Sequence, residues 1–377
     1  MDKRITLLKE AQYFYDKNRQ MARYMFGYPT YYRPLSPLTQ QLLLEHYSSP
    51  FSNNCGDIEE RGNYQMDTKS VEKKIVGLYA DKFGMGDHFW GYVTSGGSES
   101  NNCGISLAFS KYPNGILYYS AASHYSVEKY AERYPHREIQ TLGKDVMNLD
   151  ILFEKVEKNY HTKGAPANLV LTHGTTKYGA SDQIDEIVAF LRTRNIPYYI
   201  HVDAALFGGI QNNQIGAPLL TNCKERGINS VCVSLHKYVG FPDVKSVFVA
   251  TEKPVGKNVA YIGQNDTTVS GSRSIPAYAL YNHVLEHLAE QDTTLYQTNI
   301  LYFEELLVKA NVPYYRAKNS NTFVIDAPNP AIAQKYQLSC FVDWESGTWQ
   351  KRAHILIFPS HRKEEMQELI NDLKDLR

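Results

Sequence analysis

The chain has 377 residues, of which 43% are hydrophobic and 21% charged, proportions typical of a globular protein rather than of a disordered or fibrous one. Lys and Arg total 40 and balance 40 Asp and Glu, so the net charge indicates neither a nucleic-acid nor an anionic-membrane partner. The sequence contains no secretory h-region and no apolar run near the ~20 residues that span a bilayer. Its five cysteines are widely spaced without a CxxC pair, which argues against a disulfide framework. We therefore expect a cytoplasmic protein that acts on a small molecule.

Six short apolar runs, each ending near a small or polar residue, predict an α/β fold with a mainly parallel central sheet. The expected strands cover 89–94, 115–120, 168–173, 198–203, 230–235 and 246–250. Around them, apolar residues at i, i+3 and i+4 predict helices over 71–83, 99–109, 127–134, 149–158 and 184–194. Ligands of such folds bind at the carboxyl ends of the strands, so the functional residues are expected there.

The chain is predicted to have three parts, because the pattern of apolar and polar residues changes after the first fifty residues and again near Pro276. These parts are an N-terminal segment (1–52), a large domain (53–275) and a smaller α+β C-terminal domain (276–377). The last contains a long helical stretch (277–310), two short apolar runs and a closing helix (362–376). The N-terminal segment begins with a helix and has too little apolar content to fold alone, so we expect it to pack on the large domain or on a partner subunit.

Polar residues follow the first three of these strands. Gly96, Gly97 and Ser98 lie in a Ser-Gly-Gly-Ser segment before a helix, where backbone N–H groups can close around a phosphate. His124 follows the second strand, and a pair of threonines at 175–176 follows the third. Taken singly, each of these features is equally compatible with an ordinary turn or a helix cap.

Two ionisable residues follow the next two strands. Asp203 ends a nearly all-apolar run, and Lys237 comes directly after the fifth strand. A buried carboxylate is costly unless a cation pairs with it. Pyridoxal 5'-phosphate meets all of these demands together, because its aldehyde forms a Schiff base with a lysine, its ring nitrogen pairs with a carboxylate, its phosphate needs a Gly/Ser cradle and its ring stacks on an imidazole. The joint pattern predicts this cofactor.

Several segments resemble the pyridoxal-dependent group II amino-acid decarboxylases, and the likeness runs from about residue 25 to the C-terminus. It is greatest toward bacterial histidine decarboxylases and plant serine decarboxylases. The resemblance implies fold type I, as in aspartate aminotransferase, a homodimer with active sites at the subunit interface, and loss of CO2 from an L-amino acid, with L-histidine as the first choice. The segments are 52–57, 90–101, 115–127, 201–209, 234–240 and 270–273.

The resemblance also implies roles for single residues. Lys237 matches the Schiff-base lysine, Asp203 the partner of the pyridine nitrogen, and His124 the imidazole that stacks on the ring. Tyr261 lies near the mobile-loop tyrosine that supplies a proton to Cα in many relatives, which makes Lys237, His124 and Tyr261 the expected catalytic residues. Further cofactor contacts are expected from Ala205 against the ring, from Gly96, Gly97, Ser98, Ser234 and His236 near the phosphate, and from Thr175 or Thr176, of which Thr175 is taken as the candidate.

Some features depart from this family pattern or allow other readings. Serines at 95, 98 and 100 replace residues of the usual T-N-G-G-T-E-G-N segment, and 241–245 is more charged than usual; both changes affect the expected substrate more than the cofactor. Decarboxylation of serine, another pyridoxal reaction such as aminotransfer or elimination, and a non-catalytic homologue are the alternatives. An aminotransferase would need an arginine clamp, for which the C-terminal part offers Arg316, Arg352, Arg362 and Arg377.

A metal site is the last alternative. His283 and His287 stand at i, i+4, a spacing that can bind a metal on one helix face. Their order does not fit HExxH, and the sequence offers no evident third ligand. We therefore expect no metal site.

Overall fold

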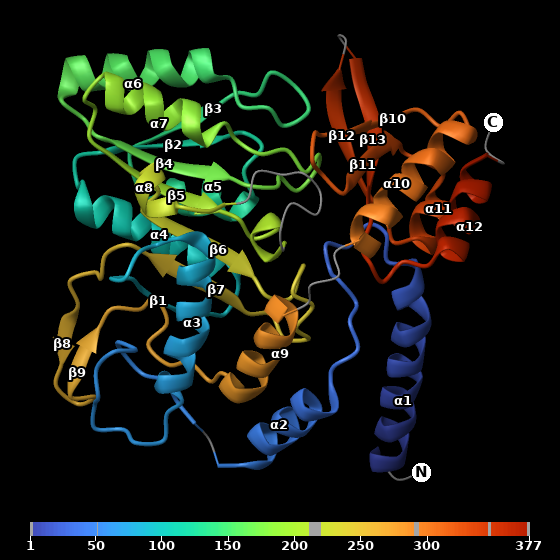
Figure 1. The fold of residues 1–377 in the computed structure, drawn as a ribbon, viewed down its shortest axis with the longest axis horizontal. Helices are drawn as coiled ribbons and strands as arrows, with labels where there is room; N and C mark the ends of the chain where they lie inside the picture. The colour runs from blue at the N-terminus through green and yellow to red at the C-terminus, as the bar shows by residue number, and fades with distance from the viewer. Residues whose placement is uncertain (1–2, 51, 211–219, 290–293, 346–347, 375–377) are drawn as a thin grey trace.

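The computed structural model describes residues 3–50, 52–210, 220–289, 294–345 and 348–374 (Figure 1). Within these residues the largest element is a seven-stranded sheet, joined by a four-stranded sheet near the C-terminus and by a two-stranded hairpin. The strands of the large sheet are β1 (Trp90–Thr94), β2 (Ile116–Ser120), β3 (His136–Ile139), β4 (Ala167–Thr172), β5 (Tyr198–Asp203), β6 (Ser230–Ser234) and β7 (Ser246–Ala250). All six predicted strands are confirmed to within one residue at each end, and the mainly parallel α/β class is confirmed with them.

The strand order of the large sheet is β1-β7-β6-β5-β4-β2-β3. Strand β7 runs antiparallel to both of its neighbours, and the other pairs are parallel. Because β5 and β6 are neighbours, with Asp203 opposite Cys232, the residues that follow these two strands lie side by side. The additional strand β3, at the edge of the sheet, was not predicted.

Five helices of the large domain overlap the predicted segments, and the short α8 (Cys223–Arg226) was not predicted. The five are α3 (Lys69–Phe83), α4 (Gly97–Lys111), α5 (Tyr125–Ala131), α6 (Leu149–Lys163) and α7 (Ile184–Thr193), and a 3-10 turn lies at Phe207–Gly209. The ends of α6 illustrate the local causes: the Asn148 side chain accepts a hydrogen bond from the Ile151 N–H at its start, and Gly164, at φ 62°, ends it. Helix α4 begins directly after β1 and packs against the central strands of the sheet.

The second sheet is antiparallel, in the order β10-β11-β13-β12. Its strands are β10 (Tyr314–Arg316), β11 (Thr322–Asp326), β12 (Ser339–Glu345) and β13 (Thr348–Leu356), and its helices are α10 (Thr294–Lys309), α11 (Pro330–Lys335) and α12 (Lys363–Lys374). Phe303, Phe323 and Leu369 share one core with Phe26 of the N-terminal segment. That segment is therefore part of the packing of the C-terminal unit.

The long helical stretch predicted over 277–310 contains two helices, α9 (Ala277–Ala289) and α10, while residues 290–293 fall outside the described ranges. Ala277, Leu280 and Val284 of α9 are buried in the core of the large sheet, whereas α10 belongs to the second core. This packing favours a domain boundary after α9 rather than at residue 276. The division into domains stays a prediction.

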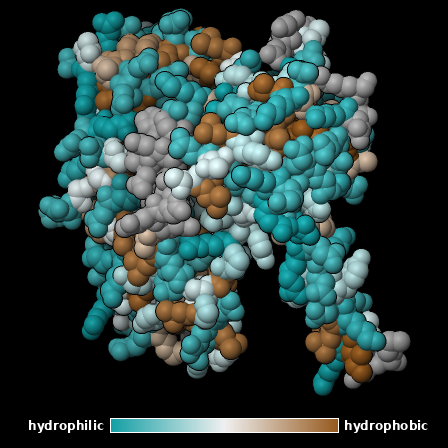
Figure 2. Space-filling view, turned by 45° about the vertical axis from the view of Figure 1, so that its right-hand side comes forward, coloured by the Kyte–Doolittle hydropathy of each residue, from teal (hydrophilic) through white to brown (hydrophobic). Residues whose placement is uncertain are grey.

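The N-terminal segment contains two helices that belong to neither sheet unit's strand layers, on either side of the stretch that packs on the C-terminal sheet. Helix α1 (Lys3–Met21) projects from the body of the molecule, as Figures 1 and 2 show, and a 3-10 turn (Ala22–Tyr24) follows it. Helix α2 (Pro37–Ser48), which Ser36 caps by accepting from the Thr39 N–H, packs on α9. No helix in the described ranges is both long enough and apolar enough to cross a membrane.

Candidate active site

A cavity of about 450 Å³ opens at the carboxyl ends of the central strands. Its floor is formed by residues that follow β1, β4, β5 and β6, and its rim by the start of α5, the N-terminal segment and the C-terminal sheet. The size is that of an ordinary cofactor or substrate pocket. Most of the predicted site residues lie on its wall: Gly96, Gly97, Ser98, His124, Asp203, Ala205, Ser234, His236 and Lys237.

Asp203 and Lys237 line the cavity from neighbouring strands. Asp203 is 5% exposed. Its Oδ1 accepts a hydrogen bond from the Ala205 N–H at 3.0 Å, and its Oδ2 accepts one from Asn101 Nδ2 at 2.8 Å. Burial lowers the pKa of Lys237, and the nearby Asp203 carboxylate partly opposes this effect. A lysine with a lowered pKa has more of its amine in the neutral, nucleophilic form.

His124 precedes α5 and also lines the cavity. Its Nδ1 lies 2.8 Å from Ser126 Oγ and accepts from the Ser126 backbone N–H at 3.3 Å. Burial lowers the pKa of His124, while Asp203 acts in the opposite direction. The imidazole is therefore held at the start of a helix in its neutral form.

Gly96, which caps α4, and Gly97, the first residue of α4, leave room for a ligand at the start of the helix. Gly96 has a φ of 143°, a conformation that L side chains rarely adopt. A Cβ at Gly97 would lie 3.2 Å from Ser234 Oγ and 3.6 Å from the Ala205 side chain, so it would fill the space between them. The Ser98 backbone belongs to the first turn of α4, where N–H groups have no partner within the helix.

The structure separates the two threonines that the sequence left open. Thr176 lines the cavity, whereas Thr175 is 1% exposed and its Oγ1 accepts a hydrogen bond from the Ala180 N–H at 3.0 Å. This placement favours Thr176 over Thr175 as the hydroxyl that contacts the cofactor, because the Thr175 hydroxyl is used inside its own turn; the assignment stays a prediction. His236 lies on the cavity wall with its Nδ1 3.2 Å from the Lys245 carbonyl oxygen.

Tyr261 lies away from this cavity. It belongs to the turn between β8 (Lys257–Val259) and β9 (Gln264–Asp266), and its side chain is 74% exposed. It does not line the cavity of its own chain. A role for Tyr261 in the reaction thus requires that the hairpin reach the site of a second subunit.

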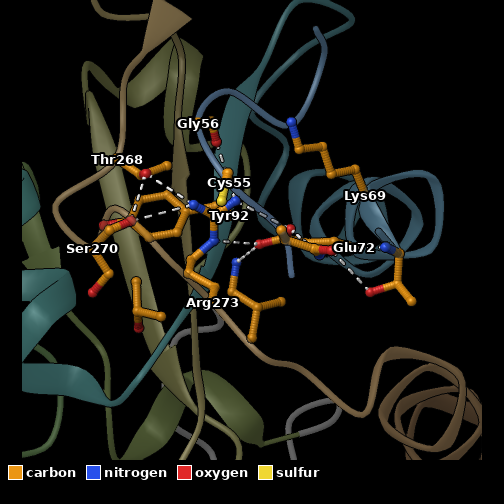
Figure 3. A network of polar contacts seen from close by, with 12 residues as sticks. Cys55, Gly56, Lys69, Glu72, Tyr92, Thr268, Ser270 and Arg273 are labelled. Carbon is orange, nitrogen blue, oxygen red and sulfur yellow. Dashed lines mark hydrogen bonds and ion pairs between the residues drawn. The ribbon is translucent and has the colours of Figure 1, made fainter. Parts of the chain in front are cut away.

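The segment 270–273 is tied to its own chain through Arg273. This arginine is 6% exposed, and its Nε and Nη2 each lie 3.3 Å from a carboxylate oxygen of Glu72 in α3 (Figure 3). Its Nη1 donates to Thr268 Oγ1 at 2.8 Å, and its guanidinium lies 5.2 Å from the centre of the Tyr92 ring. Arg273 is thus occupied internally, while Gly271 and Ser272 of the same segment are exposed.

His283 and His287 of α9 each bond a backbone carbonyl. His283 Nε2 lies 2.8 Å from the oxygen of Val239, and His287 Nε2 lies 2.7 Å from that of Gly209. These two carbonyls belong to the loops that follow Lys237 and Asp203. The two imidazoles therefore hold the loops of the site from behind, and the described part of the chain contains no group of three or more possible metal ligands.

Sequence reasoning missed the upper wall of the cavity. Gly27 and Pro29 of the N-terminal segment and Ser339, His354 and Leu356 of the C-terminal sheet complete it. Ser339 Oγ donates to the Gly27 carbonyl at 3.1 Å, and His354 Nε2 lies 3.1 Å from the same oxygen. It also missed Asn101, which lines the cavity and whose amide donates to Asp203. A polar residue among buried neighbours was the available signal for Asn101, but the upper wall carries no motif.

These residues fit pyridoxal phosphate. The glycine-lined start of α4 suits a phosphate, the buried Asp203 suits a protonated ring nitrogen, and Lys237 has the lowered pKa that imine formation requires. The cavity volume accommodates the group together with a small substrate.

Comparison with known proteins agrees with this fit. Residues 111–274 match the pyridoxal-dependent decarboxylase conserved domain. Histidine decarboxylase of Pseudomonas entomophila (strain L48) is 32% identical over 337 residues, which cover 85% of this chain and 79% of that protein. Serine decarboxylase 3 of Oryza sativa subsp. japonica is 31% identical over 339 residues, covering 86% and 73% respectively. The structure of L-methionine decarboxylase from Streptomyces sp. 590 superposes with a TM-score of 0.81 at 19% identity, covering 100% of this chain and 95% of that one, which shows the shared fold.

The chain therefore belongs to the pyridoxal-dependent decarboxylase family. It is a carboxy-lyase that uses pyridoxal phosphate and acts on an amino acid. The predicted family, cofactor and reaction class are confirmed. The assignments of individual site residues stay predictions.

Proposed function

We propose that the protein converts L-histidine to histamine and CO2. Two relatives that are 31–32% identical over 85–88% of the chain are named histidine decarboxylase. The polarity of the cavity supports the proposal independently of these names, because it suits a neutral substrate side chain that can donate a hydrogen bond.

The charges of the cavity disfavour an acidic substrate side chain. Lys237 is the single lysine among the described residues that line it, and no arginine is present there. Glu99 and Asp203 already contribute two carboxylates. A side-chain carboxylate of the substrate would be buried without a counter-charge, which costs several kcal/mol. A neutral imidazole avoids this cost.

Ser339 offers a specific contact for an imidazole. Its hydroxyl donates to the Gly27 carbonyl, so the Ser339 oxygen keeps lone pairs that can accept from a ring N–H. Serine as substrate would also find a hydrogen bond here, but its side chain is shorter and lacks the ring. Serine decarboxylation is the second candidate, favoured by the rice relative.

The reaction depends on the cofactor as an electron sink, which stabilises the negative charge left when CO2 departs. Lys237 would hold the cofactor through its amine, which burial keeps available in the neutral form. Asp203 would accept a hydrogen bond from the ring nitrogen, since its Oδ2 has a single donor, Asn101, and retains a free lone pair, whereas Oδ1 accepts from the Ala205 N–H and from the Cys232 thiol. The first turn of α4 and Ser234 would hold the phosphate.

His124 would lie against the cofactor ring and restrict the orientation of the bound amino acid. A proton must then be delivered to Cα. Tyr261 from a second subunit is our candidate donor, because its exposed position at a hairpin tip leaves it free to reach a neighbouring molecule. This placement also suits loop closure over a site, which excludes water.

The test of the substrate is a panel of L-amino acids incubated with the purified enzyme, with the amines separated by chromatography and CO2 release measured in parallel. Histamine formation with a kcat/KM at least tenfold above that of any other amino acid supports the proposal. Preferential formation of ethanolamine would establish the serine alternative, while keto-acid formation would indicate aminotransfer.

A variant at Ser339 tests the contact itself. Ser339→Ala removes the acceptor, and losing one hydrogen bond to a neutral group costs roughly 0.5–1.5 kcal/mol, or about two- to tenfold in kcat/KM for histidine. Ser272→Ala, an exposed serine outside the cavity, is the matched control. An unchanged kcat/KM in Ser339→Ala would show that the imidazole binds elsewhere in the cavity.

We also propose a homodimer in the cytoplasm. Helix α1 projects from the molecule with apolar side chains on several sides, including Ile5, Leu7, Leu8, Tyr13, Phe14 and Tyr15, each 49–70% exposed; Figure 2 shows apolar side chains at its far end. Exposed patches of this kind usually mark an interface between subunits. A solution mass of twice 43.0 kDa is expected, and a fully active monomer would refute the dimer.

The cysteines support the proposed compartment. All five are free, as is usual for proteins in a reducing compartment such as the cytoplasm.

A further inference from the structure

A buried amide links two residues that line the cavity, Asp203 and His124. Asn101 lies on α4 and is 1% exposed. Its Nδ2 donates to Asp203 Oδ2 at 2.8 Å and to Ser126 Oγ at 3.0 Å. Its Oδ1 lies 3.1 Å from His201 Nε2. All the hydrogen-bonding capacity on the amide nitrogen is thus used inside the protein.

The direction of each hydrogen bond in this chain is fixed by chemistry. A carboxylate only accepts, so the NH2 group of Asn101 faces Asp203 and its oxygen faces His201. His201 must therefore carry a proton on Nε2. Burial lowers the pKa of His201 to about 4, so its ring is neutral, and Nδ1 accepts from the Ser230 hydroxyl at 2.9 Å.

The helix that carries Asn101 also makes room for His201. A Cβ at Gly104 would lie 2.4 Å from the His201 ring. Asn101 and Gly104 are three residues apart and share one face of α4, so one bonds the imidazole and the other admits it. These two contacts with His201 fix the position of α4 relative to β5.

The direction of the hydrogen bonds also determines which nitrogen of His124 carries the proton. Because Ser126 Oγ accepts from Asn101, its own proton is directed to His124 Nδ1, 2.8 Å away. The backbone N–H of Ser126 points to the same nitrogen. His124 Nδ1 therefore accepts, and the proton of the neutral ring lies on Nε2, for which residues of the described ranges provide no hydrogen-bond partner.

We propose that Asn101 is a positioning residue that holds Asp203 and His124 in one directed hydrogen-bond chain, so that His124 presents an Nε2–H donor to the cavity. The inference rests on the roles proposed above for Asp203 and His124 toward the cofactor. It assigns His124 as a hydrogen-bond donor at Nε2, and not as a proton acceptor there. It also makes the orientation of the Asp203 carboxylate depend on α4.

The first experiment compares Asn101→Leu with Asn102→Leu. Asn102 is the next residue of α4 and is half-buried, and its side chain makes no hydrogen bond within the described chain, so it controls for the effect of leucine on the helix. We expect Asn101→Leu to lose cofactor on dialysis at least tenfold faster than wild type, and to lose roughly tenfold or more in kcat with KM within threefold. Asn102→Leu should stay within twofold of wild type in the rate of cofactor loss, in kcat and in KM. Equal behaviour of the two variants would overturn the proposal.

The second experiment reads the imidazole directly. In 15N-histidine-labelled protein, with and without pyridoxal phosphate, the His124 signals are assigned by their loss in His124→Gln. We expect an acceptor-type Nδ1 and a protonated Nε2. Ser126→Ala should shift the Nδ1 signal while cofactor retention stays within twofold, because the Asn101–Asp203 contact is intact.

A proton on His124 Nδ1 in the unmodified enzyme would overturn the inference whatever the substrate is. The expected tautomer combined with no turnover of histidine would instead refute only the proposed substrate. Should Asn101→Leu fail to fold, the tautomer of the unmodified enzyme and the response to Ser126→Ala decide the matter.

Discussion

The ion pair between Arg273 and Glu72 is buried beside the large sheet, with side-chain exposures of 4% and 0%. Four donors converge on the Glu72 carboxylate: two arginine nitrogens at 3.3 Å, Asn54 Nδ2 at 2.7 Å and the Val93 N–H at 2.9 Å. Arg273→Met removes the cation and keeps much of the side-chain length. The carboxylate is then left buried with only two neutral donors.

Breaking a buried pair in this way costs about 3–5 kcal/mol, because the remaining charge stays desolvated. At roughly 2–4 °C per kcal/mol for a domain of this size, the melting temperature should fall by about 6–20 °C. Glu72→Gln should cost a similar amount. The double variant should lose clearly less than the sum of the two, since it removes both charges together.

The assay is calorimetry at fixed protein and cofactor concentrations, because both cofactor binding and association shift the apparent stability. Arg194→Met is the matched control, since Arg194 forms an exposed pair with Glu157 at 3.1 Å and should cost at most about 1 kcal/mol. The pair does not hold segment 270–273 as argued if Arg273→Met has the same melting temperature as Arg194→Met. The same conclusion follows if the double variant loses as much stability as Arg273→Met and Glu72→Gln together.

Three further predictions concern the reaction. Lys237→Ala should abolish turnover and covalent attachment of the cofactor; borohydride-stable labelling that persists at another lysine would contradict the assignment. Asp203→Asn should keep the fold, measured by circular dichroism, but lose two or more orders of magnitude in kcat, because a neutral amide stabilises a protonated ring nitrogen far less than a carboxylate does; wild-type turnover would make Asp203 structural. Tyr261→Phe should leave CO2 release largely intact while amine yield falls below it; matching yields of amine and CO2 at the wild-type rate would assign the proton to another group.

The sheet could be predicted because most of its strands are continuous apolar runs, which is the pattern of strands buried on both faces. Strand β3 was missed for the opposite reason. Its sequence, His-Arg-Glu-Ile, is polar and only its last residue is fully buried, as suits an edge strand that must not pair with another molecule. The antiparallel direction of β7 is not encoded in its own residues, since an apolar run reads the same in either direction.

The floor of the cavity could be predicted because the topology alone brings the ends of parallel strands together. The upper wall could not. Ser339 and His354 reach the site through packing of the C-terminal sheet and the N-terminal segment, and neither residue stands in a motif. Thr175 and Thr176 are adjacent and chemically identical, so only the geometry of their turn decides which one faces the cavity.

The residues beneath the site could have been found from sequence with a stricter rule about burial. His201 stands inside an apolar strand two residues before Asp203, and a buried imidazole must find hydrogen-bond partners. Helix α4 supplies Asn101 as one partner and Gly104 as the space. Polar residues and a glycine three positions apart on a helix that follows a ligand-binding turn are thus a signal of a shared network. The serines at 95, 98 and 100, which depart from the family pattern, take no part in this network, so they leave the hydrogen bonds that orient Asp203 and His124 intact.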